Sequence, residues 1–266
     1  MCQYSASEGF FNDWHLQNAA QFAVGGAGLV ILEATAVSSN GRITPHCTGL
    51  WADEHIPSLE RIATFVRSQG AACGLQIAHA GRKSSTPSPF AGIPRAGLSV
   101  ADGGWPDTVV GASPIPWDER WITPHELTKQ EIQDITRDFV AAANRAERAG
   151  INMIEIHAAH GYLISSFLSP LSNQRTDEYG GDFDNRTRLC VEVTKAVRQA
   201  WPGQKPLSIR LSCTEWVQGG WTIDDTVALA KRLAPYVDFI DCSSGGPMFL
   251  HVHRLSVSNH QEEKRL

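Results

Sequence analysis

The sequence predicts an α/β protein built as a (β/α)8 TIM barrel that is incomplete, with about six of the eight strands present. Apolar runs of strand length alternate with helical segments, which indicates a parallel sheet with right-handed crossovers. That rhythm fits both a barrel and an open doubly wound sheet. Two observations favour the barrel: the polar and glycine-rich loops all follow strands, and no G-x-G-x-x-G motif follows the first strand. A length of 266 residues with 42% hydrophobic residues suffices for one large domain or two small ones.

The expected elements follow from the hydrophobic period, the caps and the helix-ending glycines. Thr128 and Glu131 form a capping-box pattern, and the apolar positions after them keep a helical spacing as far as Gly150. Residues 80–124 hold many prolines and glycines, so we expect a long excursion loop over the strand ends. The expected helices span residues 12–23, 56–68, 128–150, 185–200 and 224–233, and the expected strands span residues 27–34, 73–78, 152–157, 207–211 and 237–242.

The number of strands falls short of a closed barrel. Residues 1–4 resemble the end of a strand whose beginning is absent, and five whole strands follow. An open set of parallel strands leaves two edges with unpaired backbone groups, which association with a second copy of the chain would be one way to cover. We therefore expect a partial barrel over residues 1–246 and a separate tail over residues 247–266, where the alternating pattern is lost.

Composition and charge exclude several classes of partner. A net charge of −5 and a pI near 6.0 provide no basic surface for nucleic acid. The longest apolar stretches are too short to cross a membrane, and the N-terminus lacks a secretion signal, so the expected location is the cytoplasm. The six cysteines form no C-x-x-C pair, and five of them are expected to be buried free thiols.

The strand at 152–157 runs directly into His157, His160 and Tyr162. Two imidazoles and a phenol at one strand end can stabilise a developing oxyanion and supply a proton. Spacing alone leaves other interpretations open, because one histidine could cap a carbonyl and the other face solvent while the tyrosine packs. A zinc site is a further alternative, but it needs a third ligand, for which Glu33 is the one candidate, and no metal is expected.

Several blocks of the sequence together resemble the old yellow enzyme family of flavin-dependent ene-reductases. The closest resemblance is to the bacterial-type branch of NADPH dehydrogenases and xenobiotic reductases, whose first strand ends in a cysteine and a tyrosine as Cys2 and Tyr4 do here. The resemblance extends over residues 1–246. The blocks are Met-Cys-Gln-Tyr at 1–4, Glu-Ala-Thr at 33–35, Gln-Ile-Ala-His-Ala-Gly-Arg-Lys at 76–83, His-Ala-Ala-His-Gly-Tyr-Leu at 157–163, Ser-Asn-Gln-Arg-Thr-Asp-Glu-Tyr-Gly-Gly at 172–181 and Asn185-Arg186.

The resemblance implies a barrel that holds FMN at its carboxyl face. Cys2 would lie near the flavin and tune its potential, and Ala34 would contact the cofactor through its backbone. Gln76 would hydrogen-bond the pyrimidine side of the ring system, and Arg210 would face its N1–C2=O region. The chemistry agrees, because a guanidinium near N1 stabilises the anionic reduced flavin and an amide side chain both donates to and accepts from a uracil-like edge.

The resemblance also implies reduction of the C=C bond of α,β-unsaturated carbonyl compounds, with NADPH as the reductant. His157 and His160 would bind the carbonyl oxygen of the enone-type substrate or the carboxamide of NAD(P)H, and Tyr162 would protonate the α-carbon. Tyr4 and Trp216 would shape the substrate pocket. Arg82 and Lys83 are interpreted as cations at the rim of the site. Four further residues are expected to form an ion-pair and hydrogen-bond network that fixes the loop at 158–185: Arg175, Asp177, Tyr179 and Arg186.

The resemblance stops at both ends of the chain. The run that would build the first strand of the family is absent, and the sequence from Pro247 onward does not resemble the last two strands. The loops of those strands make the phosphate site in such barrels. The alternative to an active reductase is therefore a non-enzymatic truncated fragment that cannot retain FMN.

Overall fold

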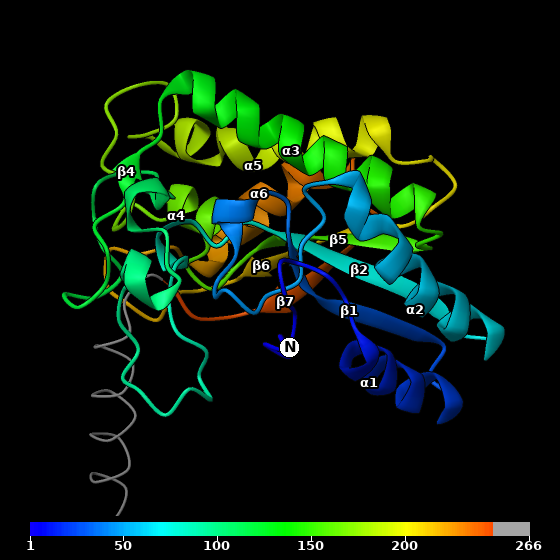
Figure 1. Cartoon of the computed structure of the whole chain (residues 1–266). Coiled ribbons are helices and arrows are strands. Elements are labelled where there is room, and N and C mark those ends of the chain that lie inside the picture. Colours follow the sequence, from blue (N-terminus) through cyan, green and yellow to red (C-terminus); the bar gives the residue numbers. More distant parts are fainter. Residues whose placement is uncertain (247–266) are drawn as a thin grey trace, which may run out of the picture.

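The computed structural model describes residues 1–246, and its main sheet contains five parallel strands in sequential order (Figure 1). This parallel sheet confirms the predicted fold class. The two outer strands, β1 and β7, do not pair with each other, so the barrel is open within the described residues. The strands of this sheet are β1 (Leu29–Ala36), β2 (Ala72–Ala78), β5 (Met153–Ala158), β6 (Leu207–Ser212) and β7 (Phe239–Ser243).

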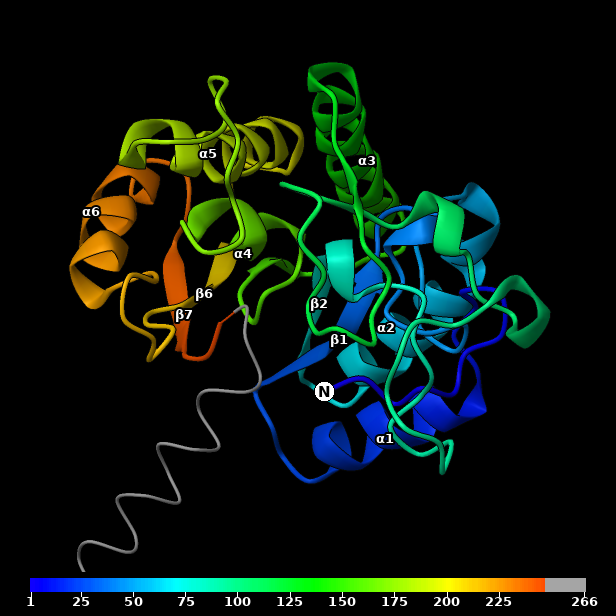
Figure 2. The same cartoon turned by 90° about the vertical axis from the view of Figure 1, so that its left-hand side faces the viewer.

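Five helices follow the outer side of this sheet in an arc, and a sixth, α4, lies among the loops at the strand ends (Figure 2). No helix of the described part of the chain is both long and apolar enough to cross a membrane. The helices are α1 (Asp13–Val24), α2 (Ile56–Ser68), α3 (Lys129–Arg148), α4 (Leu163–Leu168), α5 (Phe183–Ala200) and α6 (Ile223–Leu233).

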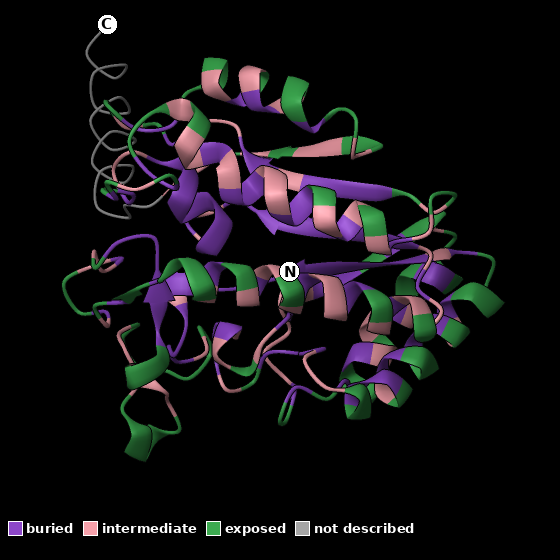
Figure 3. Ribbon diagram, turned by 90° about the horizontal axis from the view of Figure 1, so that it is seen from above, coloured by how far each residue is buried: buried purple, intermediate pink, exposed green. Residues whose placement is uncertain are grey.

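Burial divides the sheet into a covered centre and two partly exposed edges. Strands β2, β5 and β6 are buried along almost their whole length, whereas β7 is half-exposed (Figure 3). On the edge strands, Leu29, Ile31 and Phe239 are about 40% exposed. Outer helices close the other side of the core through apolar faces such as Ile132, Phe139 and Ala143 of α3.

The strand expected at residues 1–4 is not formed, so the main sheet has five strands where about six were predicted. The N–H of Gln3 donates to the side chain of Glu33 (2.7 Å) instead of joining a strand ladder. Tyr4 follows with a φ of +51°, which no strand residue adopts. The segment therefore lies against β1 as irregular backbone. The tail expected at residues 247–266 lies outside the described residues.

Short elements appear inside the two long predicted loops. Helix α4 lies within the loop expected at 158–185, and all six of its residues are buried. Strands β3 (Val110–Gly111) and β4 (His125–Glu126) form a two-residue parallel ladder that ties the excursion to its exit. Three 3-10 turns also lie in the excursion loop, at Gly81–Lys83, Val100–Asp102 and Pro106–Thr108. Two further 3-10 turns, at Ser39–Gly41 and Asp53–His55, lie between β1 and α2.

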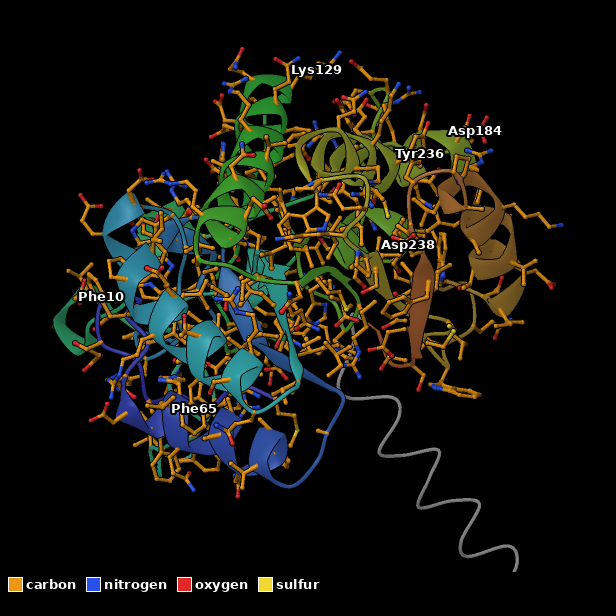
Figure 4. The ribbon with its side chains drawn as sticks, turned by 90° about the vertical axis from the view of Figure 1, so that its right-hand side faces the viewer. Phe10, Phe65, Lys129, Asp184, Tyr236 and Asp238 are labelled. Atoms are coloured by element: carbon orange, nitrogen blue, oxygen red, sulfur yellow. The ribbon has the colours of Figure 1, made fainter. Side chains whose placement is uncertain are left out.

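Ion pairs connect neighbouring elements on the outside of the molecule. Asp184 of α5 pairs with Arg232 of α6, and Asp184 and Tyr236 lie on the same side of the protein (Figure 4). Lys129, the first residue of α3, pairs with Glu178 of the loop before α5 (2.5 Å). All four charged partners are at least 40% exposed, so each pair contributes little to stability and mainly fixes helix orientation.

The capping box predicted at the start of α3 is present and gives a stability prediction. The N–H of Glu131 donates to Thr128 Oγ1 (3.2 Å), and the N–H of Thr128 donates to Glu131 Oε2 (2.7 Å). We expect Thr128→Ala to lower the free energy of unfolding by about 1 kcal/mol, because an orphan N–H of the first turn loses its acceptor. Urea unfolding followed by circular dichroism measures this loss. Gln130→Ala, in the same turn but outside the cap, is the matched control, and equal losses in both variants would contradict the assignment.

Candidate functional site

A cavity of about 570 Å³ opens at the carboxyl ends of the parallel strands, on the side where the long loops gather. Every strand of the main sheet supplies at least one residue to its wall. This is the position at which barrels of parallel strands carry their sites. The wall consists of Met1, Cys2, Tyr4, Ile31, Leu32, Glu33, Ala34, Gln76, Pro89, Phe90, Glu155, His157, His160, Tyr162, Arg210 and Asp241.

Strand register explains why polar side chains meet on this wall. Gln76 pairs with Glu155 and Glu155 with Ser208, while His157 pairs with Arg210 and Arg210 with Asp241. Because residues two apart on a strand share a face, Glu155 and His157 point to the same side of β5.

These cross-strand rows are held together by polar contacts. The amide of Gln76 donates to Glu155 (2.7 Å), and Arg210 Nε lies 3.3 Å from the Asp241 carboxylate. The wall thus combines an amide, a guanidinium and carboxylates in two neighbouring sets of cross-strand partners, Gln76–Glu155–Ser208 and His157–Arg210–Asp241.

The end of β5 and the loop after it bring two imidazoles and a phenol together, with the His157 ring in contact with the other two. The ring of His157 lies 5.2 Å from the ring of His160 and 4.9 Å from the ring of Tyr162, edge to face in both cases. The loop turns sharply, because His160 and Gly161 both have positive φ values, +62° and +72°. A Cβ at Gly161 would lie 2.4 Å from the Trp117 ring, so this turn requires glycine. Helix α4 begins directly after Tyr162 and fixes its backbone.

Hydrogen bonds set the orientation of the two imidazoles. His157 Nδ1 accepts the N–H of Ala159 (3.2 Å), which assigns the remaining proton of the neutral ring to Nε2. The backbone N–H of His160 donates to Ser212 Oγ (2.8 Å), and His160 Nε2 lies 2.6 Å from Ser243 Oγ. Both serines lie at the ends of the two following strands. The neighbouring strands therefore position the second imidazole.

Burial keeps this loop uncharged near neutral pH. Burial lowers the pKa of His157 well below its usual range, and lowers the pKa of His160 to about 4, with Arg210 and Lys83 acting in the same direction. Burial also raises the pKa of Tyr162 well above its usual range. The site thus presents neutral N–H donors and a protonated phenol.

Arg82 and Lys83 do not lie at the rim, so that part of the sequence interpretation is wrong. Lys83 Nζ donates to the carbonyl of His160 (2.8 Å) and lies 3.8 Å from the centre of the Trp117 ring and 4.7 Å from that of Tyr162. Arg82 is buried and donates to the carbonyls at positions 115 and 116. Lys83 therefore holds the loop after β5, whereas the bonds of Arg82 hold the excursion loop.

The N-terminal segment brings Cys2 and Tyr4 to the cavity, as the sequence predicted. Opposite them, the pairing of β1 with β2 shifts between Leu32 and Thr35, and Ala34 lies in this irregularity. Such a bulge leaves backbone groups of the strand unpaired, which suits a contact made through backbone. The carboxyl group of Glu33 is buried here, and burial raises its pKa to about 8.

Trp216 is the one predicted pocket residue that the structure does not bring to the cavity. Its side chain is 60% exposed, and it is absent from the cavity wall. The preceding Glu215 is anchored inward by Ser169 (2.7 Å) and by the N–H of Trp221 (2.9 Å). A φ of +59° at Trp216 then turns the chain away from the anchored glutamate. The expected role in the pocket is therefore corrected.

The loop network expected around Arg175 is present. Arg175 forms two hydrogen bonds with Asp177 (2.6 and 3.0 Å) and donates to the carbonyl oxygens of Ala112 and Leu127. Tyr179 donates to Glu192 (3.0 Å). The bonds of Arg175 attach the loop after α4 to the excursion loop, and the bond of Tyr179 attaches it to α5, away from the cavity wall.

Glu155, Asp241, Ser243 and Phe90 contribute to the site or its support and were not predicted. For Glu155 a signal existed, because strand alternation places it on the same face as His157. Phe90 gave no such signal, because it belongs to the excursion loop, which is distant in sequence. Its ring packs edge to face on the Tyr4 ring, with 6.0 Å between the ring centres. Three of the cysteines are buried, Cys47, Cys73 and Cys190, where five were expected, because Cys213 and Cys242 lie near the open edge strand.

Four histidines with lowered pKa values give a prediction for the pH dependence of stability. Burial lowers the pKa of His15, His79 and His160 to about 4, and that of His157 well below its usual range. An unfolded histidine titrates near pH 6.5, so acidification below about that pH protonates the unfolded chain first and favours unfolding. Burial raises the pKa of Glu33 to about 8 and also raises the pKa values of Asp138, Glu155 and Glu215, and these carboxyl groups act in the opposite direction. Of the four, Glu33 has a shift as large as those of the histidines.

We therefore expect a lower urea midpoint at pH 5 than at pH 7, measured by tryptophan fluorescence. His15→Gln should reduce the difference, because one of the neutral imidazoles is then absent. An equal or higher midpoint at pH 5 would contradict the assigned charge states.

The parallel β/α arrangement and the cavity at its carboxyl face define a barrel protein with a small-molecule site. The sequence profile of the NADH:flavin oxidoreductase / NADH oxidase family matches residues 1–264, and the chain belongs to this family. FMN and NAD(P)H are the cofactors of the family.

Individual relatives agree. The chain is 46% identical over 259 residues to an NADH:flavin oxidoreductase of Gibberella zeae, covering 92% of this chain and 62% of the relative. It is 43% identical over 249 residues to an NADPH dehydrogenase of Listeria innocua, covering 92% and 68%. The structure of old yellow enzyme from Pichia sp. AKU4542 matches with a TM-score of 0.72 and 25% identity, over 88% of this chain and 60% of that one. The predicted resemblance is confirmed, and the chain spans about two thirds of the length of these relatives.

The cavity wall fits the ring system of FMN. The amide of Gln76 suits the pyrimidine edge of a flavin, and the guanidinium of Arg210 is a donor of the kind that stabilises a reduced flavin. The wall offers fewer groups that could bind the phosphate of FMN, because Arg210 is the one cationic side chain among the described residues of the wall.

Proposed function

We propose that this chain carries the active site of an FMN-dependent NAD(P)H oxidoreductase that reduces the C=C bond of α,β-unsaturated carbonyl compounds. One observation carries the proposal: the His157 ring contacts the rings of His160 and Tyr162, and all three residues line the same cavity as Gln76 and Arg210. Trp216 has no part in it because its side chain faces solvent.

In this proposal the imidazoles bind the substrate. FMN, when bound, supplies the hydride that adds to the β-carbon of the alkene. The neutral rings of His157 and His160 donate N–H groups to the carbonyl oxygen, which withdraws electron density from the β-carbon. Neutral donors suit this task, because they stabilise the negative charge that develops on the oxygen without first losing a proton. The same donors would hold the carboxamide of NAD(P)H.

Tyr162 is proposed as the acid that protonates the α-carbon. Its raised pKa keeps the phenol protonated, and the enolate that accepts the proton is strongly basic, so the transfer is downhill. Lys83 lies against the Tyr162 ring and binds the carbonyl of His160, which fixes the acid relative to the imidazoles. Tyr4, which packs on Phe90, would form part of the wall of the substrate pocket.

Four residues would hold the flavin: Gln76, Arg210, Ala34 and Cys2. Gln76 and Arg210 lie on β2 and β6, so they would contact the ring from two buried strands. Ala34 would contribute backbone groups from the irregular part of β1, and Cys2 would lie beside the ring.

Reconstitution tests the proposal. The purified chain is incubated with excess FMN and desalted, and its visible spectrum is recorded. We expect a retained flavin band that NADPH bleaches without oxygen and that cyclohexenone restores. A band that NADPH bleaches but no enone restores would contradict the substrate class.

The second candidate is a non-enzymatic fragment that does not retain FMN. The observation in its favour is the scarcity of cations in the described cavity wall, where three acidic residues, Glu33, Glu155 and Asp241, accompany Arg210. In this case the desalted protein is colourless, while its circular dichroism still shows a folded α/β chain.

A further inference from the structure

Glu155 lies in the cavity wall, and no step of the proposed reaction uses it. It is 2% exposed and lies on β5, with Gln76 of β2 and Ser208 of β6 as its cross-strand partners. The two oxygens of its carboxyl group have different donors: Gln76 Nε2 donates to Oε1 (2.7 Å), and Ser208 Oγ donates to Oε2 (3.3 Å). The register of three buried strands therefore fixes both contacts.

The contact with Glu155 determines which way the Gln76 amide is turned. Rotation of a primary amide by about 180° exchanges its oxygen, an acceptor, with its nitrogen, a donor. An ionised carboxylate only accepts hydrogen bonds, so the end of the amide beside Glu155 is its nitrogen. Burial raises the pKa of Glu155, whereas the hydrogen bonds from Gln76 and Ser208 act in the opposite direction and favour the ionised form.

The oxygen of the Gln76 amide is left for a ligand. Gln76 lines the cavity, and among residues 1–246 its amide makes one hydrogen bond, from Nε2 to Glu155. The amide therefore offers the cavity its oxygen and its second N–H. An imide, the O=C–N–H unit at the pyrimidine edge of a flavin, supplies the donor and the acceptor that match them.

Arg210, the other side chain proposed to contact the flavin ring from a buried strand, needs no such orientation. A guanidinium carries donors only, so every rotation of it offers the same kind of group. Its carboxylate neighbour Asp241, 3.3 Å away, can fix its position without changing what it offers. Of the two, Gln76 is the residue whose function depends on how it is turned.

We propose that Glu155 is a positioning residue that orients the Gln76 amide, and that the cavity thereby selects ring systems with a free imide N–H. The selection rests on the proposed flavin site, whereas the orientation of the amide is a property of the chain alone. A ring with a methyl group on its imide nitrogen has no donor for the Gln76 oxygen. Such a ring should bind more weakly, because it leaves a buried acceptor unpaired.

The first test observes the amide without any flavin. The glutamine side chains are labelled with nitrogen-15, and proton–nitrogen correlation spectra are recorded at pH 7.5, well above the ordinary pKa of a glutamate. We expect a downfield N–H signal of Gln76, identified by its absence in Gln76→Leu, that exchanges with solvent at least about tenfold more slowly than that of Gln130. Gln130 is the reference because its amide also donates to a carboxylate, that of Asp134 (3.2 Å), at an exposed position.

Three variants show whether Glu155 is the cause of this signal. Glu155→Leu has a similar volume but no acceptor, so the downfield shift and the slow exchange should both be lost. Glu155→Gln, the isosteric variant, offers a donor as well as an acceptor and should give two Gln76 signals, one for each orientation. Ser208→Ala removes the other contact of the same carboxyl group and should leave the Gln76 signal in place. Circular dichroism checks that each variant is folded, and a signal that is unchanged in both Glu155 variants would overturn the orienting role.

The second test measures the selection with rings that carry no phosphate. Riboflavin and 3-methylriboflavin are titrated with the chain, and binding is followed by the quenching of flavin fluorescence. We expect riboflavin to bind at least about tenfold more tightly than its methyl derivative, and this ratio to fall to about threefold or less in Glu155→Leu, where the amide can turn. Equal affinities of the two rings for the native chain would overturn the selection. Failure of riboflavin to bind would overturn both the selection and the proposed flavin site, whereas loss of the amide signal alone would overturn only the role of Glu155.

Discussion

Replacing Tyr162 with phenylalanine is expected to slow reoxidation of the reduced flavoprotein by an enone by about 100- to 10,000-fold, the usual contribution of a positioned acid. The phenol ring lies 4.9 Å from the His157 ring and its oxygen is the one atom that the variant lacks. Reduction by NADPH needs no proton from this group, so its rate should remain within about twofold of the native value. Stopped-flow absorbance of the flavin band measures the two half-reactions separately.

Tyr4 provides a matched control for this experiment. It is also a phenol in the cavity wall, and burial keeps it protonated by raising its pKa, yet it lies on the N-terminal segment beside Phe90. Tyr4→Phe should leave the protonation step intact and change mainly the binding of substrate. If the two variants slow reoxidation equally, or if Tyr162→Phe slows both half-reactions equally, Tyr162 is not the acid.

Local sequence signals predicted the regular elements well. The Thr128 and Glu131 cap, the apolar stripe of α3 and the buried runs of the five whole strands are properties of adjacent residues, and each element appears within a few positions of its prediction. Helix α4 was missed for a physical reason: all of Leu163–Leu168 is buried, so the segment has no polar face and no helical period to detect.

The structure brings predicted site residues together where they lie on strands. His157, Gln76 and Arg210 lie on strands, and the register of a parallel sheet brings them to one wall. Failures involve residues whose surroundings come from distant loops. Lys83 is covered by Trp117 of the excursion, and Trp216 is turned outward by the bonds of Glu215. Local sequence patterns do not predict such contacts between residues that are distant in the sequence.

The cofactor expectations illustrate the same limit. The resemblance assigns Gln76 and Arg210 to a flavin ring, which stays a prediction, and both residues lie on strands of the cavity wall. The anchoring of a phosphate depends instead on loops and helix N-termini. The described wall has Arg210 and three acidic side chains. Reconstitution tests the retention of FMN, whereas β5, the loop after it and the start of α4 place the two imidazoles and the phenol.

His157→Ala is expected to lower kcat/KM for enone reduction by about 100- to 1,000-fold, the usual cost of losing one donor to a developing oxyanion. The imidazole lines the cavity with Nε2 protonated, and it lies on β5, whereas the amide and the guanidinium proposed to hold the flavin ring lie on β2 and β6. Flavin should therefore stay bound, as the visible spectrum after desalting reports. NADPH should bind more weakly too, because its carboxamide uses the same donor. Loss of flavin from the variant would contradict the assigned role.

His79 allows the structural part of this effect to be subtracted. It follows β2 as a fully buried imidazole, and its Nδ1 accepts the N–H of Gly81 (3.0 Å), as His157 Nδ1 accepts that of Ala159 (3.2 Å). Unlike His157, it is absent from the cavity wall. His79→Ala removes the same local hydrogen bond and a similar buried volume, so both variants should lose comparable stability. A much larger loss of kcat/KM in His157→Ala then isolates the donor function, whereas equal losses would reduce His157 to a packing residue.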